Sequence, residues 1–113
     1  MAITPKALIE SQQLTNANAI YYTATNVRTI IDKFTLVNTT AGAVTATVDI
    51  VASGGTAGVA SRLISARSIA AGETYTCLEI VGHIMNSGDT IQALASANTS
   101  ITIRASGREV SGV

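Results

Sequence analysis

Apolar and polar residues alternate in short runs along this chain, and the pattern predicts β-strands. The clearest run covers residues 43–52, where Val44, Ala46, Val48 and Ile50 alternate with Thr45, Thr47 and Asp49. Successive side chains of a strand point to opposite faces, so the aliphatic set should face a core. The helical spacing of three and four residues is nowhere sustained, so helices are not expected as main elements.

Residues 29–38 form the second strong strand of the prediction. One face of this strand is expected to carry Ile30, Phe34 and Leu36, with Asp32 as the exception to the pattern. The other face is expected to carry Ile31, Lys33, Thr35 and Val37. The turn at residues 39–42 is too short for a parallel crossover, so this strand and the next should form an antiparallel hairpin.

Further strands are expected at residues 18–24 (with Ile20 and Tyr22 on one face), 65–69, 74–81, 90–96 and 100–105, while residues 6–13 and 59–66 are ambiguous. Many short strands separated by turns are typical of sandwiches and barrels, not of βαβ folds. The sequence therefore predicts one all-β domain over residues 1–113, an antiparallel β-sandwich of jelly-roll type. The expected core residues are Val44, Ala46, Val48, Ile50, Leu78, Ile80, Ile101 and Ile103.

Glycines mark the predicted turns. The sequence Gly-(Glu/Asp)-Thr occurs at residues 72–74 and 88–90, and each glycine can supply a positive φ before a strand begins. Residues 53–58 are glycine-rich but lack the lysine of a phosphate-binding loop, so they are interpreted as a hairpin tip. Asp89 follows Asn86 and Ser87, which predicts a turn cap and not an ion ligand.

Both ends of the chain are expected to act as extended arms, at residues 1–6 and 106–113, that reach neighbouring subunits. Pro5 cannot donate a hydrogen bond to a strand ladder, and the C-terminal segment has little apolar content. Simple fraying of the ends is the alternative. Residues 1–10 lack a basic segment followed by an apolar run, so no signal peptide is expected.

Charged residues make up only 12% of the chain, against ~25% in typical soluble domains, and the formal net charge is zero. A neutral surface of Thr, Ser, Asn and Gln costs little to desolvate and favours association. The composition indicates a homo-oligomer or a larger assembly, with dimer and trimer both open, although a low-charge secreted domain is an alternative. Scattered cations argue against nucleic acid binding, and no apolar run is long enough to span a membrane.

Residues that usually carry catalysis or bind metals are scarce. The chain holds one cysteine, Cys77, and one histidine, His83, and has no paired carboxylate motif. A Cys–His nucleophile pair also requires an orienting group, and a zinc site requires three or four ligands. We therefore predict no catalytic residue, no metal site, no cofactor and no enzymatic activity. The sequence assigns no binding residues.

Carbohydrate binding is the alternative functional class. Sandwich lectins commonly stack sugars on exposed aromatic rings, and Tyr21 and Tyr22 are adjacent, so one of them should face outward from a strand. An outward tyrosine is more typical of a protein interface, which is the interpretation we favour.

The order of several short motifs resembles that of small virion structural proteins of tailed bacteriophages. The motifs are Tyr22-Thr23-Ala24, the strand from Ile30 to Thr39, the strand from Val44 to Val51, Ser53-Gly54-Gly55, Leu63-Ile64-Ser65, the turn from Ala70 to Thr74 and the turn from Gly88 to Ile91. The resemblance implies a virion component made in the host cytoplasm. It would be a capsid decoration or cement protein that contacts copies of itself and a larger virion protein such as the major capsid protein, or else a neck, tail or fibre-associated protein.

Overall fold

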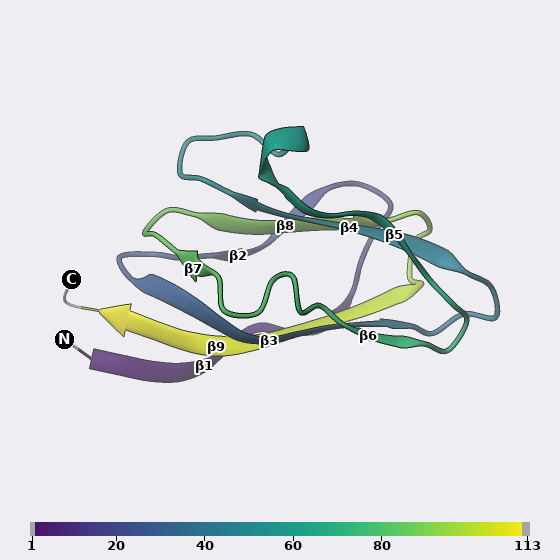
Figure 1. Cartoon of the computed structure of the whole chain (residues 1–113), viewed down its shortest axis with the longest axis horizontal. Coiled ribbons are helices and arrows are strands. Elements are labelled where there is room, and N and C mark those ends of the chain that lie inside the picture. The colour runs from purple at the N-terminus through teal and green to yellow at the C-terminus, as the bar shows by residue number, and fades with distance from the viewer. Residues whose placement is uncertain (1, 112–113) are drawn as a thin grey trace.

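The computed structural model describes residues 2–111 and shows two β-sheets packed face to face (Figure 1). The elements are β1 (Ala2–Gln13), β2 (Ala19–Thr23), β3 (Arg28–Asn38), β4 (Val44–Val51), the 3-10 helix η1 (Val59–Ser61), β5 (Arg62–Ile69), β6 (Thr74–Thr76), β7 (Ile84–Met85), β8 (Thr90–Ala95) and β9 (Ile101–Ser111). Sheet A has the strand order β1-β9-β3-β6, with β7 also paired to β3, and sheet B has the order β2-β8-β4-β5.

The strand pairing is nested around the middle of the chain. β4 pairs with β5, β3 with β6 and β7, β2 with β8, and β1 with β9, all antiparallel, as in one long hairpin. The hairpin rolls up because β9 also pairs with β3, and β8 with β4. This nesting, divided between two sheets, is a jelly roll, so the predicted fold class is confirmed. The hairpin predicted for residues 29–38 and 43–52 is wrong, because β3 belongs to sheet A and β4 to sheet B. The turn at residues 39–42 therefore carries the chain from one sheet to the other, and each strand pairs with other partners.

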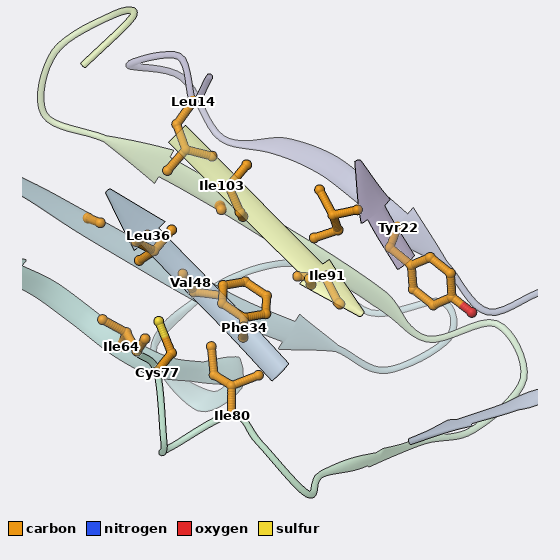
Figure 2. Close-up of a cluster of buried hydrophobic side chains, with 14 of the residues drawn as sticks. Leu14, Tyr22, Phe34, Leu36, Val48, Ile64, Cys77, Ile80, Ile91 and Ile103 are labelled. Atoms are coloured by element: carbon orange, nitrogen blue, oxygen red, sulfur yellow. The ribbon is translucent and has the colours of Figure 1, made fainter. Parts of the chain in front are cut away.

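The core lies between the sheets, and Phe34 is its largest fully buried side chain (Figure 2). Most of the expected core residues are buried, and Ile50 is partly buried against them. Leu78 is 74% exposed, so its prediction is wrong. The strand expected at residues 74–81 ends at Thr76, and the chain then turns, which breaks the alternation but still buries Ile80.

β-Bulges explain where simple alternation fails. On β3, Ile31 pairs with Gly107 and Lys33 with Ser106, so Asp32 is an extra residue that reverses the faces of the strand. Ile31 is consequently buried and does not share a face with Lys33, contrary to the prediction. Ile30 likewise faces outward, away from the buried Phe34 and Leu36 with which the prediction grouped it. On β2 a similar shift leaves Tyr22 buried and Ile20 59% exposed, so these two residues do not share a face either.

The segments left ambiguous by sequence belong to strands. Residues 6–13 lie in β1, an edge strand that tolerates Pro5 because only β9 pairs with it, and residues 59–66 contain η1 and part of β5. The C-terminal segment is not a polar tail, because β9 continues to Ser111 within sheet A and pairs with the start of β1. Met1 and residues 112–113 lie outside the described residues. Contact of either end with a neighbouring subunit stays a prediction.

The two Gly-(Glu/Asp)-Thr turns have the same construction. Gly72 has a φ of 72° and Gly88 a φ of 93°, as predicted. In each turn the carboxylate after the glycine accepts a hydrogen bond from the backbone N–H three residues earlier, at 2.8 Å for Glu73 with Ala70 and 2.9 Å for Asp89 with Asn86. The repeated sequence therefore encodes a repeated structure, once before β6 and once before β8.

Candidate interaction surface

The outer face of sheet A, at the end that carries both chain ends, combines exposed aliphatic and charged side chains. Odd-numbered residues of β9 from Ile101 to Gly107 are buried, so its even-numbered residues face outward. The strand register extends this face across β1, β3 and β7. We call this surface the sheet A patch, and it consists of Ile3, Pro5, Arg28, Ile30, Lys33, Ile84, Arg104, Arg108 and Val110.

The apolar part of the sheet A patch comes from two cross-strand pairs. Ile3 pairs with Val110, and Ile30 pairs with Ile84. The two pairs are adjacent on the same face of the sheet. Ile30 also pairs with Arg108 of β9, and Arg108 lies two residues before Val110, so both β9 residues point the same way. Ile3 is 56% and Ile84 63% exposed. Exposed aliphatic side chains that gather in this way are typical of interaction sites.

The charged part of the sheet A patch is mostly positive. Its cations are Arg28, Lys33, Arg104 and Arg108, four of the seven in the chain. Among the strands of sheet A, the exposed carboxylates are Asp32 on β3 and Glu10 on β1, since Glu109 points between the sheets toward Tyr22. Arg108 donates from Nε and Nη2 to the two Asp32 oxygens, both at 3.0 Å, which raises the pKa of Arg108. The patch thus keeps a net positive charge.

A polar hollow of about 480 Å³ adjoins the sheet A patch at Arg28 and is lined by Asn26, Val27, Arg28, Asn86 and Ser87. The N–H of Asn26 donates to Ser87 Oγ at 3.2 Å, which ties the β2–β3 turn to the β7–β8 turn. Amide, hydroxyl and guanidinium groups of this kind can receive a carboxylate or another polar group of a partner.

A buried network supports the sheet A patch from inside. Tyr22 on β2 donates to Glu109 on β9 at 2.5 Å, and its hydroxyl lies 2.7 Å from the Thr29 hydroxyl on β3. Lys6 Nζ lies 3.4 Å from the same Glu109 oxygen. Burial, and then the hydrogen bond to Glu109, raises the pKa of Tyr22 to about 12. The network joins the two sheets under the patch.

A second exposed feature lies along the β6 edge of sheet A, and we call it the acidic edge: Glu73, Leu78 and Glu79, all exposed. Glu79 accepts a hydrogen bond from the Tyr75 hydroxyl, at 2.5 and 2.7 Å to its two oxygens, and this bond lowers the pKa of Glu79. The Arg67 guanidinium of β5 stacks 4.2 Å from the centre of the Tyr75 ring, which closes the edge between the two sheets.

The two residues considered as a nucleophile pair lie in different environments. Cys77 is buried in the core with Ile64 and Ile80 (Figure 2), and burial raises the pKa of its thiol to about 12. His83 is exposed in the segment before β7. A nucleophilic cysteine requires an accessible sulfur and a lowered pKa, so the surroundings of Cys77 act in the opposite direction. The lack of enzymatic activity stays a prediction.

Asp89 caps a turn, as predicted. Besides the N–H of Asn86, its carboxylate accepts the N–H of Ser53 at 3.1 Å, which fixes the start of the 53–58 loop. Within residues 2–111 no three His, Cys, Asp or Glu side chains are grouped so as to hold a metal ion. The same range contains no helix that is long and apolar enough to cross a membrane.

The adjacent tyrosines do not form a sugar-stacking platform. Tyr22 is buried, and Tyr21 is partly buried against the core, whereas stacking requires a ring with an open face. The feature that motivated the carbohydrate alternative therefore has another role, in packing and in the network under the sheet A patch.

Sequence reasoning missed both surfaces. The sheet A patch assembles residues that are far apart in the chain. The bulge at Asp32 determines which β3 residues face outward, and the only sign of that bulge in the sequence is an aspartate at a position where the alternation predicts an apolar residue. Leu78 was assigned to the core because it continues an apparent alternation that the structure ends at Thr76.

The fold and these surfaces define a single jelly-roll domain with an outward apolar and basic face. No protein-family model and no curated protein matches the chain. Among solved structures, a chain in the structure of infectious bursal disease virus Gx strain is similar, with a TM-score of 0.53 and 14% identity. The similarity covers 98% of this protein but 33% of the viral chain, so this protein spans about a third of that chain's length. At this identity the likeness shows a shared fold.

Proposed function

We propose that this protein is a non-enzymatic structural component of a virion, and specifically a capsid decoration or cement protein that stabilises the shell through protein–protein contacts. The sheet A patch is the observation that carries the proposal. Ile3 and Ile84 are more than half exposed on a chain with few charges, and a neighbouring protein that covers them would remove this apolar surface from water.

The fold supports the same setting. Jelly rolls recur in viral capsid proteins, and a solved structure that this chain resembles is that of a virus. Jelly rolls also recur in lectins, but Tyr22 is buried and Tyr21 is partly buried, so the feature that motivated that alternative does not support it. The motif order that resembles tailed-phage virion proteins favours a phage particle. A neck, tail or fibre-associated position is the alternative, and it would use the same surfaces.

Imaging of particles tests the proposal. This chain would be produced with a tag, and virus particles would be purified from the same culture. The tag would then be labelled, and the particles would be examined by cryo-electron microscopy. Regularly spaced label on the capsid faces is the expected result. Label in a ring at the neck or along the tail would replace the decoration role with the alternative. Complete absence from washed particles would contradict a virion role of either kind.

A further inference from the structure

We infer that the sheet A patch binds the acidic edge of a second copy of this chain, in a head-to-tail contact. This inference deepens the proposed function by naming the homo-oligomeric contact, and it rests on surfaces of the chain itself. The patch offers aliphatic side chains among cations, and the acidic edge offers Leu78 next to Glu79, with Glu73 at the other end of β6. The two surfaces are therefore complementary in both polarity and charge.

Charge disfavours the simpler contact of two identical patches. In a two-fold contact each copy would present Arg28, Lys33, Arg104 and Arg108 to the same cations of its partner. Only Asp32, and Glu10 on the edge strand β1, would offset them. Like charges brought together at an interface disfavour that arrangement. Because the whole chain is neutral, the surface outside the patch carries the compensating negative charge.

The acidic edge is the part of that remaining surface that also presents an apolar anchor. Leu78 is 74% exposed and lies directly before Glu79, while Glu73 lies at the other end of β6. Arg67 is the nearby cation, and its guanidinium is held over the Tyr75 ring. Val59 on η1 and Ile20 on β2 are also exposed outside the patch, at 87% and 59%, but neither has a carboxylate beside it in sequence.

A face and an edge of one sheet point in perpendicular directions, so each copy in such a contact is rotated relative to the previous one. A heterologous contact with a rotation can close into a ring, which is the usual outcome for identical subunits that do not form a filament. Ring closure would give the homo-oligomer that the low charge of the chain indicates.

Mixing of variants tests the inference with the purified chain alone. Ile84→Ser damages the patch and Leu78→Ser damages the edge, and both side chains are already exposed, so both variants should fold. By sedimentation velocity, each variant alone should self-associate at least about tenfold more weakly than the wild type, as expected for loss of a buried aliphatic contact. An equimolar mixture should form a heterodimer, because the intact patch of one variant can bind the intact edge of the other.

Val59→Ser is the matched control and should associate as the wild type does. For charge, Lys33→Gln/Arg104→Gln should weaken association about tenfold, whereas Ser68→Glu/Ala97→Glu, with the same change in net charge outside the patch, should not. If Leu78→Ser associates like the wild type while Ile84→Ser does not, the patch binds itself or another protein and the inference is wrong. A chain that stays monomeric at all concentrations also overturns it, while particle imaging still tests the proposed function independently.

Discussion

Replacement of Gly107 by alanine should be among the most destabilising single changes in this protein. Gly107 lies in β9 between β1 and β3, and a Cβ added there would meet the Ile30 carbonyl oxygen and, at 2.9 Å, Leu8 Cδ1. The Leu8 tip can move, but the Ile30 carbonyl belongs to the backbone of a central strand. Overpacking of a core commonly costs about 1–3 kcal/mol, and a clash with fixed backbone belongs at the upper end.

We therefore expect a loss of about 3 kcal/mol for Gly107→Ala, a large part of the roughly 5–15 kcal/mol of a whole domain. Urea unfolding followed by circular dichroism measures it through the shift in midpoint at constant m-value. Gly42→Ala is the matched control, since its Cβ would meet nothing within 4 Å, and it should be neutral or slightly stabilising. Adding Leu8→Ala to Gly107→Ala should not restore stability. A Gly107→Ala variant within about 0.5 kcal/mol of the wild type would refute the reasoning.

Three further predictions concern buried polar groups and the cysteine. Asn38→Ala should cost about 3 kcal/mol in urea unfolding, because it removes three hydrogen bonds of a buried side chain. The Asn38 amide donates to the carbonyls of Gly42 and Ile69, at 2.8 and 2.9 Å, and its oxygen accepts the N–H of Thr40 at 2.9 Å. An effect as small as that of the exposed Asn98→Ala would contradict this. Tyr22→Phe should lower the free energy of unfolding by about 2 kcal/mol, and the variant should lose less stability than the wild type at alkaline pH. The raised pKa means that native Tyr22 keeps its proton longer than the unfolded chain, so stability holds below pH 10 and falls as the pH approaches 12; an unchanged pH profile in the variant would count against the network. Cys77 should react with iodoacetamide at pH 8 only after unfolding, and rapid labelling of the native protein would show that the thiol is not buried as described.

The fold class was predictable because it depends on local patterns. Alternation over residues 43–52, the short turn before it and the glycine turns each specify a strand or a reversal without reference to distant residues. The recurring Gly-(Glu/Asp)-Thr sequence even specified the sign of φ at Gly72 and Gly88. Errors occurred where strand pairing overrides alternation, as at Asp32, where β3 has a bulge between the pairs Ile31–Gly107 and Lys33–Ser106.

The ends of the chain show the same limit. Pro5 was one reason to expect an arm at the N-terminal end, and Gly107 lies in the segment expected to form the C-terminal arm. Neither residue type favours a strand. In the fold, Pro5 lies on an edge strand and Gly107 lies where three strands approach too closely for a side chain. Both residues are therefore compatible with β-structure, but only once the strand order is known.

The surfaces were harder to predict than the fold because the net charge of the chain conceals how its charges are distributed. Arg104 and Arg108 are four residues apart, so their shared face on β9 could be seen from sequence. Lys33 joins them only because the Asp32 bulge turns it outward, and Ile84 joins them only because β7 pairs with β3. A neutral chain can therefore present a basic apolar face and an acidic edge at the same time. Low charge favours association, and this division of the charge specifies which surfaces of two copies can meet.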